Sequence, residues 1–204
     1  MRLILASTSP RRAEILRNAG FTFDIQAPNV DEAHQPGEDA ETYVRRISEA
    51  KANAVGQDAL LAGSPAIVIA ADTVVLAGRQ ILAKPKDAED ARRMLRLLSA
   101  ATHEVLTGLS VIRAYDGISF ARLERTRVEF VRLSETDIEA YIQTKEPFDK
   151  AGAYGIQGTG GRFVRRIEGC YFNVMGLPLS RVWEILREMR WDDLNMMMSG
   201  AAAK

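Results

Sequence analysis

The chain has 204 residues, of which 47% are hydrophobic and 26% are charged, the balance of a folded protein rather than a disordered one. Lysine and arginine together number 27, as do aspartate and glutamate, so the formal net charge is zero. A global basic field for nucleic acid or an anionic membrane is therefore excluded, and any anion site must be local. Cys170 is the only cysteine, which excludes an intrachain disulfide and cysteine-rich zinc clusters.

The apolar segments are short. None approaches the roughly 20 residues that span a bilayer, and residues 3–6 are too few for a signal sequence. We therefore expect a protein of the reducing cytoplasm that does not attach to membranes. The length indicates one domain, or two small lobes around a cleft. We expect a single domain over residues 1–190 and a loose tail over residues 191–204, which carries small residues and no helix caps.

The apolar pattern predicts alternating strands and helices along the first half of the chain. The first expected elements are a strand over 3–6, a helix that Ser9 caps and Gly20 ends, and a half-buried strand over 21–25. A helix over 40–55 that Gly56 stops comes next. It is followed by a buried central strand over 66–71, which ends just before Asp72, and by a hairpin that turns at 77–79. This alternation is typical of α/β proteins.

Longer strands are predicted for the second half. The first expected element is a helix capped by Asp87, with the apolar stripe Ala91, Met94, Leu95 and Leu98. An antiparallel strand pair over 104–114 and 119–132 follows, and then a helix capped by Ser134. The last elements are a hairpin of 162–167 with 171–174 and a helix after Pro178 with Val182, Trp183 and Leu186 inward. The fold class is therefore α/β, with a mixed, largely twisted sheet, flanking helices and two lobes around a cleft.

The segment Ser7-Thr8-Ser9-Pro10-Arg11-Arg12 lies between an expected strand and an expected helix. A helix N-terminus directs backbone N–H groups and the positive end of its dipole to one point. Hydroxyls and two guanidinium groups at that point suit a polyphosphate, which accepts many hydrogen bonds. The same residues equally fit an ordinary serine cap with solvated arginines.

Acidic residues occur at two positions of interest. Asp72, followed by Thr73, comes where ligands of open α/β sheets bind, at the end of a buried strand. A carboxylate there suits Mg²⁺ or proton transfer from water, although a turn aspartate would look the same. Asp31 and Glu32 form an ordinary surface pair unless their loop returns to Asp72, because a hard cation needs several carboxylate oxygens.

Residues 145–158 are rich in glycine and contain two lysines and Gln157, and Lys84 precedes a proline earlier in the chain. Glycines let a backbone approach a ligand, lysines neutralise phosphates, and a glutamine amide can pair with a base edge. A flexible surface loop has the same composition. The segment is not a P-loop, because Gly-Lys-Ser/Thr is missing.

Together these residues resemble the Maf family of nucleoside triphosphate pyrophosphatases. The segments that carry the resemblance are, in family order, Leu-Ala-Ser-Thr-Ser-Pro-Arg-Arg (5–12), Val-Asp-Glu (30–32), Lys51-Ala52, Ala-Asp-Thr-Val-Val (71–75), Lys84-Pro85, Thr107-Gly108 and Lys-Ala-Gly-Ala-Tyr-Gly-Ile-Gln-Gly (150–158). They span nearly the whole chain, to about Met189. Ala70 departs from the family, which frequently has glycine there.

The resemblance implies a Maf-like fold, similar to that of inosine triphosphate pyrophosphatases. It implies a cytoplasmic enzyme that uses Mg²⁺ or Mn²⁺ to cleave a nucleoside triphosphate into the monophosphate and pyrophosphate, with Asp72 as the proton acceptor. The branch that acts on dTTP and UTP carries Gly-Ile-Gln, as residues 155–157 do here, and the specificity positions of the family map onto Arg11, Thr73 and Gln157. The family is also linked to arrest of cell division and septum formation.

On this basis we expect a set of hydroxyls and cations to bind the triphosphate, namely Ser7, Ser9, Arg11, Arg12, Lys51 and Lys84. Asp72, with Glu32, would hold the metal, and a water near Asp72 would attack the α-phosphorus. The sequence leaves open whether Asp72 is a base or a metal ligand, because a tight ligand is a poor base. Gln157 would pair with uracil or thymine, and modified pyrimidine nucleotides stay open as substrates.

Other functions remain as alternatives. A nucleotide-sensing regulator of septum formation would use the same phosphate site without turnover. The branch that acts on 7-methyl-GTP resembles this sequence less, because an acidic residue typically stands in place of Gln157. A nucleic-acid binder is disfavoured by the zero net charge and the lack of a basic stripe with interleaved aromatics. A homodimer is compatible with the sequence, although no apolar helix stripe is left over for an interface.

Overall fold

The computed structural model describes residues 1–63 and 65–191, which form two compact units. The first contains Met1–Asp72, Gly108–Leu123 and the chain from Gly176 on, and the second contains Thr73–Thr107 and Glu124–Met175. The chain passes between the units within three strands, β3 (Ala66–Ala77), β5 (Thr102–Arg113) and β6 (Ser119–Phe130). The expectation of a single domain over 1–190 stays a prediction. The expected tail, apart from Trp191, lies outside the described residues.

Within the described residues, seven strands form one sheet in the order β2-β1-β3-β5-β6-β7, with β4 paired to β3. The remaining strands are β1 (Arg2–Leu5), β2 (Asp24–Ile25), β4 (Gln80–Leu82) and β7 (Val164–Glu168). β1 pairs in parallel with β2 and β3, whereas β4 and β7 pair antiparallel with β3 and β6. The mixed sheet and its helices confirm the predicted α/β class.

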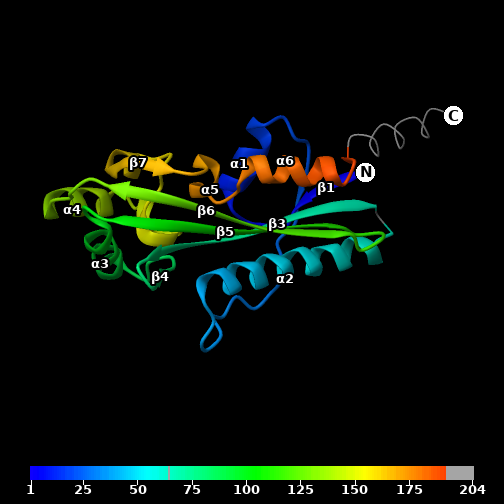
Figure 1. Ribbon diagram of the computed structural model, residues 1–204, viewed down its shortest axis with the longest axis horizontal. Coiled ribbons are helices and arrows are strands. Elements are labelled where there is room, and N and C mark those ends of the chain that lie inside the picture. The colour runs from blue at the N-terminus through cyan, green and yellow to red at the C-terminus, as the bar shows by residue number, and fades with distance from the viewer. Residues whose placement is uncertain (64, 192–204) are drawn as a thin grey trace. The chain divides into compact units, whose positions relative to one another are not determined.

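Helices cover both faces of the sheet in the first unit. They are α1 (Pro10–Asn18), α2 (Ala40–Leu61) and α6 (Leu179–Glu188). Figure 1 shows α2 on one face of the sheet and α1 and α6 on the other. The α2 residues Ala52, Val55 and Ala59 pack in one buried cluster with Ile4 of β1 and Val68 of β3. Because most of these helix side chains are small, the helix lies close to the strands.

α2 continues past Gly56, so the predicted helix end at that residue is wrong. A Cβ atom added at Gly56 would lie 3.2 Å from Cγ2 of Ile112 on β5. Glycine in a helix interior costs about 1 kcal/mol relative to alanine, but here it permits close packing while Val55 and Ala59 on either side stay buried. Tertiary packing therefore outweighs the local signal for a helix end.

The second unit has a core rich in aromatic residues. Its helices are α3 (Ala88–Leu98), α4 (Glu135–Gln143) and α5 (Tyr171–Val174), and its 3₁₀ turns are η1 (Glu146–Asp149), η2 (Ala151–Ala153) and η3 (Thr159–Phe163). The rings of Phe130 and Tyr154 meet edge-on, with centroids 4.7 Å apart. His103 is 2% exposed, and its Nε2 lies 2.8 Å from the Tyr154 hydroxyl oxygen. Burial lowers the pKa of His103 to about 4, because a buried ring disfavours the charged form.

Elements with strong local signals are confirmed. The Asp87 side chain accepts a hydrogen bond from the backbone N–H of Asp90 at 2.8 Å, and the buried residues of α3 are those predicted. Ser134 and Asp137 form the capping box that begins α4. The hairpin of β3 and β4 also occurs, with Gly78 at φ +59° in its turn.

Two expectations near the C-terminal end are wrong. Residues 171–174 form α5 rather than a strand. Asn173 in this helix is fully buried, and its Nδ2 donates to the carbonyl of Val105 and to the Thr126 hydroxyl, each at 3.0 Å, which ties α5 to β5 and β6. On α6, Trp183 is 43% exposed, and Ile185 is buried instead.

Two predicted strands differ from those in the structure. Only Asp24–Ile25 of the predicted strand over 21–25 is a strand, and Ile25 is half exposed. β3 runs on to Ala77, because the later residues Val75 to Ala77 pair with β4. Asp72 therefore lies within the strand rather than at its end.

In the described part of the chain, no helix is long and apolar enough to cross a bilayer.

Candidate functional site

The corner between β1 and α1 is organised around the hydroxyl of Ser7. Ser7 is 5% exposed, and its Oγ accepts hydrogen bonds from the backbone N–H of Ser9 at 3.1 Å and from Nη1 of Arg12 at 3.2 Å. Ser9 takes the N-cap position of α1 in an extended conformation, but its side chain makes no capping hydrogen bond. The predicted capping role of the Ser9 hydroxyl is therefore wrong, and the Ser7 side chain instead holds this turn.

Arginine side chains give this corner its positive charge. Nε of Arg12 donates to the carbonyl oxygen of Gly176 at 2.8 Å, which fixes the guanidinium beside the Ser7 hydroxyl. Burial lowers the pKa of Arg12, and the nearby charge of Asp72 opposes this shift. Arg11 is close enough to lower the pKa of Arg12 further by repulsion. An arginine stays protonated despite such shifts, so the corner carries two adjacent positive charges.

A buried lysine joins two carboxylates beside this corner. Lys51, on α2, is 5% exposed, and Asp72, on β3, is 7% exposed. Nζ of Lys51 lies 2.8 Å from Oδ1 of Asp72 and 2.9 Å from Oε1 of Glu32. Burial raises the pKa of Asp72, whereas Lys51 and then Arg12 act to lower it. The loop that carries Glu32 thus does return to Asp72, which was the condition for assigning Glu32 to a site.

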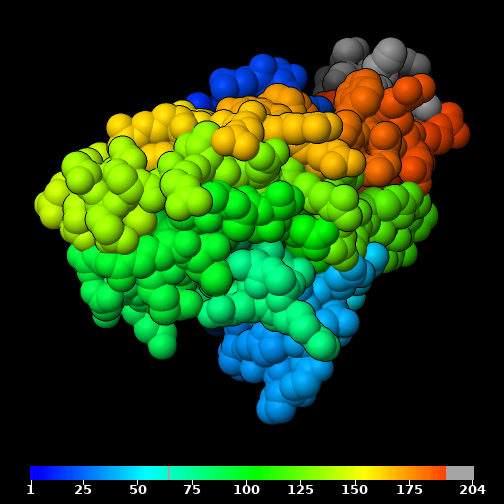
Figure 2. Space-filling view, turned by 60° about the vertical axis from the view of Figure 1, so that its left-hand side comes forward, coloured from blue at the N-terminus to red at the C-terminus, as the bar shows by residue number. Residues whose placement is uncertain are grey.

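The loop around Glu32 is tied to the start of α2. The Tyr43 hydroxyl donates to the carbonyl of Glu32 at 3.0 Å, and Nη2 of Arg46 donates to the carbonyl of Ala33 at 3.0 Å. Arg46 also forms an ion pair with Glu38, with Nε and Oε1 2.6 Å apart. Residues 31–37 are otherwise exposed, in the light-blue region of Figure 2. Neither Tyr43 nor Arg46 was predicted to hold this loop, because a helical tyrosine and arginine carry no local signal for such a contact.

The carboxylates of Asp72 and Glu32 fit a divalent cation that is shared with a substrate. They meet at one ammonium group, and no cluster of three or more histidine, cysteine, aspartate or glutamate side chains occurs among the described residues. Mg²⁺ usually keeps several waters and binds one or two carboxylates plus phosphate oxygens, so two carboxylates suffice. Asp72 and Glu32 therefore suit such an ion, in competition with Lys51.

The other residues predicted for the site belong to the second unit. Oγ1 of Thr73 lies 2.9 Å from Oγ1 of Thr107, so this hydroxyl is held by a buried neighbour. Lys84 is exposed just after β4. Gln157 is exposed in the turn between η2 and η3, and no hydrogen bond joins its amide to another described residue. The structure thus leaves the Gln157 amide available to a ligand.

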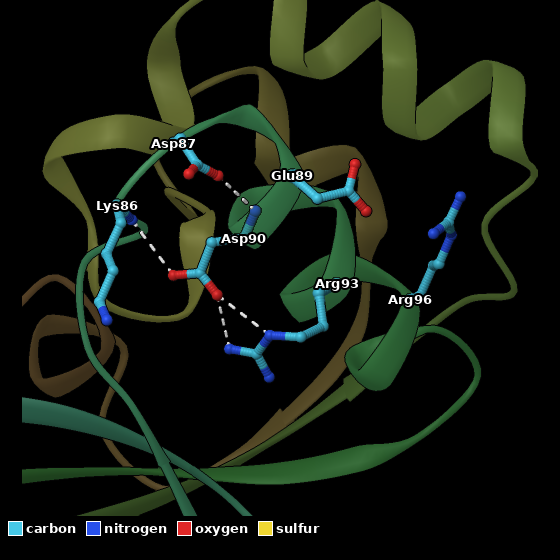
Figure 3. A pocket seen from close by; sticks show the side chains of 6 residues that line it. All are labelled: Lys86, Asp87, Glu89, Asp90, Arg93 and Arg96. Atoms are coloured by element: carbon cyan, nitrogen blue, oxygen red, sulfur yellow. Dashed lines mark hydrogen bonds and ion pairs between the residues drawn. The ribbon is translucent and has the colours of Figure 1, made fainter.

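A separate hollow over the start of α3 contains none of these residues. It has a volume of about 450 Å³, and the residues that line it are Lys86, Asp87, Glu89, Asp90, Arg93 and Arg96 (Figure 3). Two of its charges pair with each other, since Asp90 lies 2.7 Å from Nη2 of Arg93, and Asp90 also accepts a hydrogen bond from the backbone N–H of Lys86 at 3.1 Å. Internal pairing makes this hollow a weak candidate for an anion site compared with the corner around Ser7.

The fold and this site define an α/β protein with a buried lysine–aspartate ion pair beside a cationic corner. The Maf-like protein family matches residues 2–189. The chain is 47% identical to a dTTP/UTP pyrophosphatase of Anaeromyxobacter dehalogenans, over 91% of this chain and 93% of that protein. It is 48% identical to a dTTP/UTP pyrophosphatase of Vibrio cholerae, over 92% of this chain and 97% of that protein. The chain therefore belongs to the Maf-like protein family.

A solved structure of a nucleoside-triphosphatase, described as a dITP/XTP pyrophosphatase, from Mycobacterium abscessus aligns with 96% of this chain and 98% of its own. The identity is 12% and the TM-score is 0.39. Because this score is low, the fold class depends on the observed sheet and on the family match.

Proposed function

We propose that this protein hydrolyses dTTP and UTP to the nucleoside monophosphate and pyrophosphate. The observation that carries the proposal is the buried Lys51 ammonium, which contacts both Asp72 and Glu32 beside the cationic corner of Ser7 and Arg12. The names of the relatives support the choice of substrates, since proteins 47% and 48% identical over most of the chain are dTTP/UTP pyrophosphatases.

The corner and Lys51 would bind the triphosphate. Ser9 and Arg11 stand at the N-cap and in the first turn of α1, where N–H groups and the helix dipole favour an anion. Arg12 would add a guanidinium that the Gly176 carbonyl and Ser7 already orient. Because these donors are held before the substrate arrives, little reorganisation is needed as negative charge develops on the leaving pyrophosphate. Lys84, an exposed lysine, stays a predicted phosphate ligand.

Asp72 would accept a proton from the attacking water or hold the metal that activates it. Its pKa is raised by burial, and a higher pKa makes a carboxylate a stronger base, while Lys51 opposes this rise. Mg²⁺ or Mn²⁺, held by Asp72 and Glu32, would supply positive charge to the phosphate oxygens when bound. In either role, the charge of Lys51 favours the ionised form of Asp72.

Recognition of the base would come from Gln157, with Thr73 and Arg11 as further specificity residues. The Gln157 amide offers one donor and one acceptor, which match the N3–H and O4 edge of uracil and thymine. A mismatched buried amide costs about 1–3 kcal/mol, or roughly fivefold to more than a hundredfold in rate.

We further infer a cytoplasmic location, since Cys170 has no cysteine with which to form an intrachain disulfide.

Pyrophosphate release from UTP, dTTP, GTP and 7-methyl-GTP in the presence of Mn²⁺ tests this function. Wild type should prefer UTP and dTTP, and Asp72→Asn should lose roughly 10²- to 10⁴-fold in kcat, the usual contribution of a general base. Asp58→Asn, an exposed acid on α2, is the matched control and should keep full activity. Wild type that binds UTP without releasing pyrophosphate would instead be a nucleotide sensor, and a preference for 7-methyl-GTP would move it to the other branch.

A further inference from the structure

We propose that Glu146 is a positioning residue that sets base discrimination, because its carboxylate holds in place the turn that carries Gln157. This inference rests on the proposed function, and it goes further by naming the group that orients the base-reading amide. Neither Glu146 nor its partner Tyr141 had a role in the sequence-based site.

The Glu146 carboxylate accepts hydrogen bonds from the segment that follows Gln157. Its Oε2 accepts the backbone N–H of Thr159 at 2.8 Å, and its Oε1 accepts the backbone N–H of Gly160 at 3.2 Å. Oε1 also accepts the hydroxyl of Tyr141 at 2.8 Å. Burial raises the pKa of Glu146, but these hydrogen bonds outweigh it and leave the pKa below its ordinary value. The group is therefore a carboxylate at neutral pH.

Tyr141 extends the same network to the segment that precedes Gln157. Its side chain is fully buried, and its hydroxyl oxygen accepts the backbone N–H of Gly155 at 3.1 Å. A single carboxylate and a single hydroxyl thus hold the backbone on both sides of Gln157, at Gly155 and at Thr159 and Gly160. Hydrogen bonds to a charged group are roughly twice as strong as neutral ones, so this network holds the turn in place.

The glycines of this turn allow its backbone to lie directly against the network. A Cβ atom at Gly158 would lie 2.3 Å from Oε1 of Glu146, and one at Gly160 would lie 2.6 Å from the Tyr141 hydroxyl. Such distances are far inside van der Waals contact, so a side chain at either position would displace the Glu146 carboxylate or the Tyr141 hydroxyl. The close approach also shows that the carboxylate is enclosed by the turn it holds.

Two residues beside this turn adopt a left-handed backbone conformation that normally favours glycine. Lys145, directly before Glu146, has φ +61°, and Ala153, shortly before Gly155, has φ +60°. This conformation is unfavourable in a residue with a side chain, and it persists where surrounding contacts over-determine it. The strain therefore adjoins the same network, as expected where a precise backbone position is needed.

The position of the Gln157 side chain depends on this backbone. No hydrogen bond from another described residue fixes the exposed amide. An amide can turn over and exchange its donor and acceptor, and it then matches cytosine instead of uracil. If the turn relaxes, the amide loses its fixed approach to the base, whereas the residues proposed to bind phosphate are unchanged. The effect should therefore appear in KM and in base preference rather than in kcat.

The test compares Glu146→Gln, Tyr141→Phe and the control Glu139→Gln. All three are nearly isosteric, and Glu139 is an acid of α4 that pairs with Arg92 and does not contact the turn. Steady-state kinetics with UTP, CTP and GTP, together with the melting temperature, are measured for each variant. We expect Glu146→Gln and Tyr141→Phe each to raise the KM for UTP about tenfold with kcat changed less than threefold, since a lost charged hydrogen bond of ~1.5 kcal/mol is about tenfold.

The preference for UTP over CTP and GTP should fall by a similar factor in both variants and stay unchanged in Glu139→Gln. Variants that melt at a lower temperature but keep the wild-type KM and base preference would overturn the inference and leave Glu146 a structural residue. A fall in kcat alone would overturn it too. Wild type that shows no preference for UTP and dTTP would overturn the proposed function, and this inference with it.

Discussion

Replacing Lys51 by methionine removes the charge that stabilises Asp72 and keeps a side chain of similar length. Asp72, 7% exposed, would then lack the ammonium that now lies 2.8 Å from Oδ1. Removing one partner of a buried ion pair costs about 3–5 kcal/mol, because the remaining charge is left without compensation. Proteins of 150–250 residues lose roughly 2–4 °C in melting temperature per kcal/mol, so the expected fall is about 6–20 °C.

The loss in Lys51→Met should depend on pH with a definite sign. Burial already raises the pKa of Asp72, and without Lys51 that pKa rises further. Since Asp72 in the folded protein then binds a proton more tightly than in the unfolded chain, its contribution to stability is greatest at low pH. It falls as the pH rises from about 4 through the folded-state pKa. Urea unfolding followed by far-UV circular dichroism in metal-free buffer, at acid and neutral pH, measures the loss of stability and its dependence on pH.

The double variant Lys51→Met/Asp72→Leu isolates the ion pair from the shape of the site. Replacing both partners by apolar residues is often neutral in stability, so the double variant should recover about 2 kcal/mol or more of the loss. Lys84→Met, at an exposed lysine, is the control and should change stability by less than about 0.5 kcal/mol. A Lys51→Met protein as stable as wild type at neutral pH would refute the reasoning, because Asp72 would then not depend on Lys51.

Three further predictions concern other parts of the chain. Gln157→Glu should lower kcat/KM for UTP and dTTP more than for other nucleotides, and equal losses on all substrates in the pyrophosphate assay would remove Gln157 from base recognition. Because burial lowers the pKa of His103 to about 4, the folded protein should lose roughly 3 kcal/mol as the pH falls from about 6.5 to about 4; urea unfolding of His103→Gln should show a flatter profile. Gly108→Ala would place a Cβ atom 2.2 Å from the carbonyl oxygen of Val44, so it should lower the stability by about 1–3 kcal/mol or more. Gly56→Ala, whose Cβ meets only a side-chain methyl at 3.2 Å, should cost less in the same unfolding assay.

We propose that Gln157 and Glu146 act on the base, whereas Lys51 and Asp72 act on the triphosphate. Lys51 and Asp72 lie in the first unit, whereas Gln157 and Glu146 lie in the second. Variants of the first group should therefore change turnover on every nucleotide alike, and variants of the second should change the ratio between nucleotides. This division gives each proposal its own kinetic readout.

The sequence by itself determined the elements whose signals lie within a few residues of one another. The Asp87 cap, the stripe of α3, the capping box at Ser134 and the hairpin at Gly78 were all predicted, because capping and periodicity are local properties of the backbone. It also indicated Asp72 and, on one condition, Glu32 as candidate residues. Their residue types and the resemblance to the Maf family were enough for that.

Only the tertiary structure decided which of these groups meet. That Lys51 is buried between Asp72 and Glu32, or that Tyr141 and Glu146 hold the turn around Gln157, follows from how distant segments pack. The same cause lets α2 continue past Gly56. Contacts between residues far apart in the chain depend on the burial of whole faces, and neither a helix-forming tyrosine nor a surface glutamate carries a local signal of its eventual partner.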